Sequence, residues 1–157
     1  MSKARIEKLL SEMPFFEGLE PEFLEFLADS ARFRQVEKNE GLFRQGDPAN
    51  RFFLLREGSI SIEIPAIAGP TLQVQRLGPG KILGWSWLLP PYKWSFQARA
   101  EEDCEVLEFD GRVILSRCED DPRFGYELIK RFSALMAERL DAAHRKMMDQ
   151  WSPPGFA

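Results

Sequence analysis

The spacing of apolar residues changes twice along the chain. Over residues 3–29 they recur at intervals of three and four, which is typical of amphipathic helices, and Pro14 separates two such segments. Over residues 31–110 they come in short runs or alternate with polar residues, as at 59–64, which is typical of half-buried strands. Helical spacing then returns, most clearly over 122–149. The pattern predicts a mainly β fold with flanking helices.

Turn-forming residues divide the middle segment into short pieces. Clusters of Gly, Asn, Asp and Pro lie at 38–41, 45–48, 57–59 and 78–80. Residues 95–100 and 104–109 fit a closing hairpin. Many short strands at regular spacing indicate a β-barrel or jelly roll. We therefore predict a double-stranded β-helix (jelly roll) of about eight strands over residues 31–110.

The segment at 122–149 is expected to form one long helix with an apolar seam. The seam residues are Phe132, Leu135, Met136, Leu140, Ala143 and Met147. Spacings of three and four suit either packing against the chain's own barrel or pairing with a second copy. We expect residues 128–136 to contact the barrel and residues 140–147 to extend beyond it, which favours a parallel homodimer.

Composition narrows the classes of function. The 157 residues, 44% hydrophobic and 29% charged, fit one domain over 1–150 with a tail at 151–157. A net charge of −4 gives no general attraction to nucleic acid or to an acidic membrane surface. Arg139, Arg145 and Lys146 lie among acidic residues and are expected to form a solvated face. Neither a secretory signal nor a membrane-spanning stretch is apparent, so we expect a cytoplasmic protein.

Candidate catalytic chemistry is sparse. Cys104 and Cys118 lack metal-type spacing, and two cysteines in a chain of this size fit a reducing compartment. His144 is the single histidine and has no partners at metal-ligand spacing, so a surface or seam position is expected. One histidine cannot build a histidine-rich metal site. We therefore expect no enzyme activity and no required cofactor.

Five segments together carry a family resemblance. They are Phe15-Phe16-x-Gly18-Leu19, the strand–turn–strand stretch 38–47, the strand and glycine turn at 52–60, the approach 77–84, and Ala98-Arg99-Ala100. The combination resembles the cyclic-nucleotide-binding domain family over about residues 14–150, and within it bacterial catabolite-activator-type regulators. The resemblance implies a sensor domain in which a small molecule repositions the long helix.

Residues 80–100 hold three of the four tryptophans and coincide with that family's phosphate-binding cassette. The resemblance implies a glycine and a short helix facing a cyclic phosphate, a glutamate binding the ribose, and an arginine followed by Ser or Thr binding the phosphate. Gly84 and Ser95 match the glycine and the hydroxyl. Trp85 stands at the glutamate position and Trp94 at the arginine position.

The candidate ligand site thus keeps the frame of the cassette without its charged contacts. Its residues are Gly84, Trp85, Ser86, Trp87, Leu88, Lys93, Trp94 and Ser95. Lys93 could supply a point charge and Ser86 a hydroxyl. Two interpretations stay open: the tryptophans wall a pocket for a flat or apolar ligand, or they collapse inward and fill it.

The lost contacts predict weaker nucleotide binding. A hydrogen bond to a charged partner contributes about 1.5–3 kcal/mol. Losing two would lower the affinity by about two to four decades. The effector is then a weakly bound cyclic nucleotide or another small molecule.

Three functions fit these observations. The first is a small-molecule sensor that signals through its long helix. The second is a ligand-independent scaffold that binds a protein partner. The third is the regulatory half of a transcription regulator, and because too few residues follow residue 149 for a recognition helix, we expect no direct binding to nucleic acid.

Overall fold

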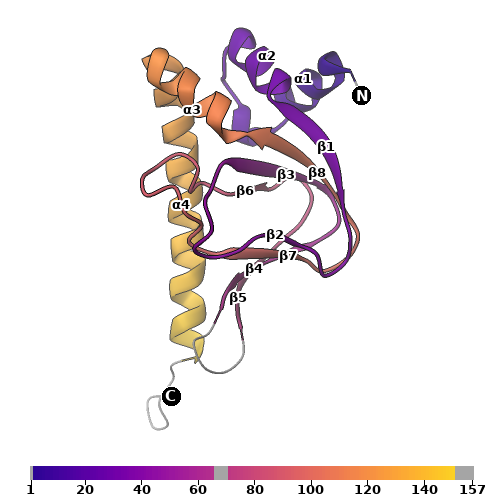
Figure 1. The fold of residues 1–157 in the computed structure, drawn as a ribbon, viewed down its shortest axis with the longest axis vertical. Helices are drawn as coiled ribbons and strands as arrows, with labels where there is room; N and C mark the ends of the chain where they lie inside the picture. The colour runs from indigo at the N-terminus through magenta and orange to yellow at the C-terminus, as the bar shows by residue number, and fades with distance from the viewer. Residues whose placement is uncertain (1, 66–70, 151–157) are drawn as a thin grey trace.

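The computed structural model describes residues 2–65 and 71–150, in which helices from both ends of the chain pack against two β-sheets (Figure 1). The helical elements are α1 (Lys3–Ser11), η1 (Pro14–Phe16, a short 3-10 helix), α2 (Pro21–Asp29), α3 (Gly111–Asp120) and α4 (Pro122–Gln150). The strands are β1 (Ala31–Val36), β2 (Gly41–Phe43), β3 (Arg51–Glu57), β4 (Ile60–Ile64), β5 (Leu72–Leu77), β6 (Ile82–Leu83), β7 (Gln97–Ala100) and β8 (Cys104–Asp110). The predicted tail at 151–157 lies outside the described residues.

The eight strands form two antiparallel sheets of four. Their orders are β1-β8-β3-β6 and β2-β7-β4-β5. Figure 1 shows the two sheets facing each other, with β1 and β8 beneath the helices at one end and α4 running past the side of the roll toward β5. This arrangement confirms the predicted jelly roll with N-terminal helices and a long C-terminal helix.

Strand β3 separates two hydrophobic cores. Successive side chains of a strand point to opposite faces, so Phe53 and Leu55 enter the interior of the roll while Phe52 and Leu54 enter the core beneath the helices. Phe52 stacks on its cross-strand neighbour Phe109, with ring centroids 4.3 Å apart. Both faces of β3 are therefore buried, which explains its nearly continuous apolar sequence.

Local signals set the ends of the helices. Pro21 occupies the first position of α2, where its missing N–H costs nothing. The Asp110 side chain accepts hydrogen bonds from the backbone N–H groups of Arg112 and Val113 and so caps α3. These signals place α3 and α4 directly after the last strand, where α4 can reach the loop that follows β6.

The structure divides the predicted seam of α4 between two faces. Phe132 and Leu135 are buried against the chain's own domain, as expected for residues 128–136. Ala143 is buried there too, although residues 140–147 were expected to extend beyond the barrel. Leu140 and Met147 are 69% and 56% exposed, and Met136 is half-buried. The single apolar stripe seen in the sequence is therefore two adjacent stripes, one for the core and one for solvent.

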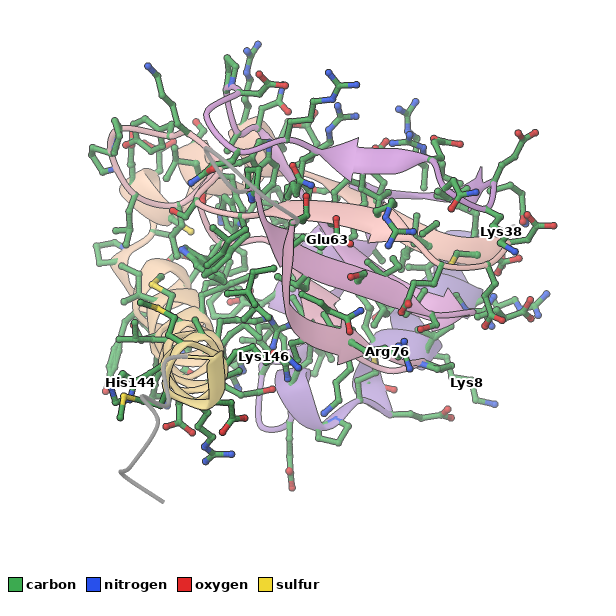
Figure 2. All side chains as sticks on the ribbon, turned by 90° about the horizontal axis from the view of Figure 1, so that it is seen from below. Lys8, Lys38, Glu63, Arg76, His144 and Lys146 are labelled. Carbon is green, nitrogen blue, oxygen red and sulfur yellow. The ribbon has the colours of Figure 1, made fainter. Side chains whose placement is uncertain are left out.

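Residues 2–65 and 71–150 hold neither a candidate membrane-spanning helix nor a candidate metal cluster. No helix there is long and apolar enough to cross a membrane, and no three potential metal ligands gather. Burial raises the pKa of the Cys118 thiol to about 12, so this thiol stays protonated at neutral pH. His144 lies on the side of α4 that faces away from the sheets (Figure 2).

Candidate functional site

The candidate site begins at Gly84, directly after β6. Gly84 has φ +95°, a conformation that favours glycine, and a Cβ atom there would lie 2.9 Å from Cζ3 of Trp94. Two tight turns follow, closed by bonds from Leu88 N–H to the Trp85 carbonyl and from Tyr92 N–H to the Leu89 carbonyl, both 3.0 Å. The segment therefore forms turns where the family resemblance implied a short helix.

The prolines in this segment give a physical reason for the turns. Pro90 and Pro91 have no N–H groups, so they cannot donate the hydrogen bonds that would extend a helix through them. Without a helix, no helix dipole is directed at the space beside Gly84. The cassette has thus lost a backbone feature in addition to its two charged side chains.

The Trp94 indole covers Gly84. It is 4% exposed and stacks on Phe43, with ring centroids 3.9 Å apart and an interplanar angle of 14°. The backbone on either side is fixed, because Trp94 N–H donates to the Asp47 carbonyl (3.0 Å) and Gly46 N–H donates to the Trp94 carbonyl (2.9 Å). A cavity of about 10 Å³ remains, which is about the space of one water molecule.

Trp87 faces away from this cavity, into the core beneath the helices. It is 1% exposed and its Nε1–H donates to the Gly84 carbonyl at 3.3 Å. Its ring packs on Phe52 (5.1 Å between centroids) and edge-on against Phe132 of α4 (5.2 Å). Leu88 is buried in the same cluster. Trp87 and Leu88 therefore anchor the loop to α4.

The remaining candidate residues separate into two locations. Ser86 and Ser95 line the cavity, as does half-buried Trp85, which meets Phe96 edge-on at 5.4 Å. Lys93 is exposed and lines a different groove of about 420 Å³ between the loop and α3. The point charge predicted for the cavity from Lys93 is thus placed elsewhere.

Arg139 of α4 reaches the cavity, and the prediction of a solvated face at this position was wrong. The residue is 1% exposed, and its Nη2–H donates to the Ile82 carbonyl at 2.6 Å. Its Nη1 donates to Gln75 Oε1 (3.3 Å) and to Glu138 Oε1 (3.2 Å). Burial lowers the pKa of Arg139, opposed by Glu138, but a guanidinium remains charged in proteins. The cavity therefore has a cation from the helix in place of one from the cassette.

The sequence contained a sign that Arg139 is buried, but the charged residues around it favoured a solvated position. Position 139 lies four residues after Leu135 and four before Ala143, both on the buried stripe of α4. Phe43 and Phe96 also line the cavity and were not among the predicted site residues. They lie on either side of the loop in the sequence, and only the pairing of β2 with β7 brings them together.

Arg99 lies on the same strand face as Gln97, because successive side chains of a strand alternate between its two faces. Both side chains donate to Glu63, at 2.9 Å to Oε2 from Arg99 and at 3.1 Å to Oε1 from Gln97. Burial alone would raise the pKa of Glu63, but bonds from Gln97, Ser61 and Arg99 outweigh it and lower the pKa. Figure 2 shows Glu63 among the strands. Arg99 is thus engaged by Glu63 and does not line the cavity.

Comparison with known proteins agrees with this geometry. Residues 33–121 match the family model described as cyclic nucleotide-binding domain. The chain belongs to this family. A cyclic nucleotide-binding domain (CNB domain) is a regulatory sensor domain, and the matched range includes the loop between Gly84 and Ser95.

Individual relatives support the assignment. The chain is 28% identical over 130 residues to the Cyclic AMP receptor protein of Thermus thermophilus, covering 83% of this chain and 58% of that one. It is 37% identical over 75 residues to the Acetyltransferase Pat of Mycolicibacterium smegmatis, covering 48% and 22%. A solved cyclic nucleotide-binding domain from Methylobacillus flagellatus superposes with a TM-score of 0.76 at 14% identity, covering 98% and 86%, which supports the fold alone. The chain spans less than two thirds of the two curated relatives.

Proposed function

We propose that this CNB domain is a non-enzymatic sensor that signals through α4 and binds cyclic nucleotides weakly or a different small molecule in their place. One observation carries the proposal: the cavity beside Gly84 is covered by Trp94 and walled by Arg139 of α4. A ligand that moves Trp94 therefore meets a side chain of the signalling helix directly.

Weak nucleotide binding follows from what a nucleotide would have to replace. It would displace the Trp94 indole from Phe43, and a stacked aromatic pair contributes about 0.5–1.5 kcal/mol beyond its buried area. It would gain no bond from a cassette glutamate or arginine, which are Trp85 and Trp94 here. Both effects reduce affinity relative to a cassette with charged contacts.

Two contacts connect the cassette loop with α4. Arg139 donates to the Ile82 carbonyl just before Gly84, and Trp87 packs on Phe132 just after it. A change in the loop would alter both contacts, and a ligand that favours one arrangement of them shifts the position of α4. The helix is therefore the output of the sensor.

The output is proposed to be read by a second copy of the chain. The exposed and half-buried apolar residues of α4 include a stripe of five, Tyr126, Ile129, Met136, Leu140 and Met147, while exposed Met148 lies next to its end. Their spacings of three, seven, four and seven fit the a and d positions of a coiled coil. This stripe lies beside the buried one, so α4 can pair with a partner helix while it stays packed on its own domain.

The main alternative is a scaffold that needs no ligand. The filling of the cavity by Trp94 favours it, since α4 is already held by Arg139. In that case the domain presents a fixed α4 to a protein partner. A regulatory half of a longer transcription regulator is compatible with either alternative, given the similarity to the Thermus protein.

The test is a titration with cyclic AMP and cyclic GMP, followed by tryptophan fluorescence and melting temperature. A ligand at a hundred times its Kd adds about 2.7 kcal/mol of stability, so binding shifts the melting temperature. We expect a response only toward millimolar concentration in the wild type. The Trp85→Glu/Trp94→Arg variant restores both charges and should respond at a concentration at least tenfold lower.

An unbiased metabolite screen with the same readouts separates a changed ligand from none. A hit that alters fluorescence and oligomeric state supports the sensor. No response to either nucleotide or to the metabolites, with an unchanged oligomeric state, would contradict it and favour the scaffold.

A further inference from the structure

The cavity beside Gly84 is rich in positive charge and hydrogen-bond donors. Arg139 (1% exposed) and Ser86 (6% exposed) both line it, and Ser95 contributes a second hydroxyl. Among the described residues, no acidic side chain lines this cavity. The nearest carboxylate to the guanidinium is that of Glu138, whose side chain is 49% exposed and which also accepts from Gln75 Nε2 at 3.1 Å. A buried cation whose single carboxylate partner is largely in water favours an anion.

The guanidinium has donors to spare. It carries five N–H groups, and its three hydrogen bonds to Ile82, Gln75 and Glu138 all come from the two Nη atoms. The Nε–H and one Nη hydrogen are left for a further acceptor. An arginine fork matches the two oxygens of a carboxylate better than it matches a single oxygen.

The other walls of the cavity are aromatic. Phe43, Trp85, Trp94 and Phe96 surround the donors, and flat rings bind flat ligands by stacking. The Trp94 side chain can make room for a ligand without a change in the backbone. Its backbone is fixed by bonds to Gly46 and Asp47, whereas its indole is held by the stack on Phe43. A change of its side-chain rotamer leaves the strands in place and frees a space the size and shape of an indole.

We propose that this cavity binds a compact aromatic carboxylate: the ring replaces the Trp94 indole on Phe43, and the carboxylate pairs with Arg139. This inference rests on the proposed sensor function and names its ligand class. The carboxylate takes the Nε–H and the free Nη hydrogen of Arg139, so it joins α4 to the loop that follows β6. Ser86 and Ser95 supply hydroxyl donors to the same carboxylate.

The test compares matched charged and neutral probes. Indole-3-carboxylate and benzoate are titrated against indole-3-carboxamide and benzamide, with calorimetry for affinity and tryptophan fluorescence for the site. A charge-assisted bond should make each carboxylate bind about tenfold or more tighter than its amide. The Trp94→Ala variant, in which the space is already open, should bind both members of each pair more tightly and keep the preference.

Variants on α4 test whether the guanidinium of Arg139 causes the preference for carboxylates over amides. Arg139→Met should bring the carboxylates to the affinity of the amides, and Arg139→Lys should retain part of the difference because it keeps the charge without the fork. Arg145→Met is the matched control, since Arg145 is 75% exposed and pairs with Asp141 on the same helix, and it should change nothing. If Arg139→Met unfolds, the wild-type and Trp94→Ala comparisons still decide the question.

The outcomes separate this inference from the function on which it rests. Equal binding of carboxylates and amides, or no binding of either to Trp94→Ala, overturns the aromatic carboxylate. If a nucleotide or another metabolite then still shifts the oligomeric state, the sensor function stands without it. If no ligand of any class shifts that state, both fail together.

Discussion

The two ends of the cassette loop use tryptophan in opposite ways. At the first end, Trp87 lies between Phe52 and Phe132 and its N–H is bonded to the Gly84 carbonyl. At the second end, Trp94 stacks on Phe43 beside a cavity of about 10 Å³. Both indoles are buried in the same hydrophobic cluster, but only Trp94 borders the cavity. Similar burial therefore conceals different roles, and the neighbours of each ring distinguish them.

The largest expected effect comes from removing the core tryptophan. Trp87→Ala should lower the free energy of unfolding by about 3–5 kcal/mol, because it leaves a large cavity between β3 and α4. Trp94→Ala should cost about 1–3 kcal/mol, because that ring borders space that solvent can fill. Urea denaturation of both variants measures the difference. Equal losses would contradict the division of the loop into a core end and a ligand-site end.

The next largest loss of stability is expected at Gly84, which contacts both tryptophans. Its carbonyl accepts a bond from Trp87, and the Trp94 indole covers it. Gly84→Ala places a residue at φ +95° and puts a methyl group 2.9 Å from Trp94, so it should cost about 2–4 kcal/mol. When Trp94 is also replaced by Ala, the part of this cost that comes from the steric contact disappears. The combined loss should then be smaller than the sum of the single losses by about 1 kcal/mol. Strict additivity in a double-mutant cycle would show that the indole does not rest on Gly84.

A charge cluster on β1, β3 and β8, whose side chains do not line the cavity, sharpens the comparison. Buried Glu108 accepts bonds from Arg32, Arg34 and Arg51, and these outweigh the effect of burial to lower the pKa of Glu108. A lowered pKa in the folded state means that the ionised carboxylate stabilises the fold above the ordinary glutamate pKa of about 4.3. That stability is lost as the pH falls through the lower, folded value.

Glu108→Gln should therefore cost about 1–3 kcal/mol at pH 7 and progressively less as the pH falls below about 4. Unfolding measured from pH 3 to pH 7 gives the profile. Ligand response should be unchanged, because none of these four side chains lines the cavity. A cost that is independent of pH would contradict the charged role of Glu108.

The smallest effect on the protomer is expected on the exposed stripe of α4. Leu140→Glu should shift a homodimer to monomer, with the dissociation constant raised tenfold or more, and should change the protomer's unfolding by less than about 0.5 kcal/mol. Light scattering after size-exclusion chromatography measures the mass. Asp141→Ala is the control next to it. A wild-type protein that is monomeric at all concentrations would remove the dimer from the proposal.

The sequence predicted the elements more completely than the site. Alternation and turn residues placed the strands and the roll, because those signals are local and the half-buried strands repeat every second residue. The contacts of the α4 seam were harder to predict from the sequence. Its apolar residues span two adjacent faces of the helix, and the position of the roll determines which face is covered. Phe132 is buried against the domain, whereas Leu140 is exposed to solvent.

The site depended on contacts that no local pattern contains. Lys93 is adjacent to Trp94 in the chain but points into another groove. Arg139 is 55 residues from Gly84 and reaches the same cavity, and its charge made a solvated position the natural expectation. Gly84 and Ser95, which matched the family pattern, both line the cavity, and their role in ligand binding stays a prediction.

The most direct test of the central claim is fluorine NMR of protein labelled with 5-fluorotryptophan, with signals assigned by single Trp→Phe variants. Titration with cyclic AMP to millimolar concentration and with indole-3-carboxylate follows Trp94 and Trp87 separately. We expect the Trp94 signal to move with ligand, while the Trp87 signal moves little. Movement of Trp87 without Trp94, or no movement of Trp94 with a ligand that binds, would contradict the account.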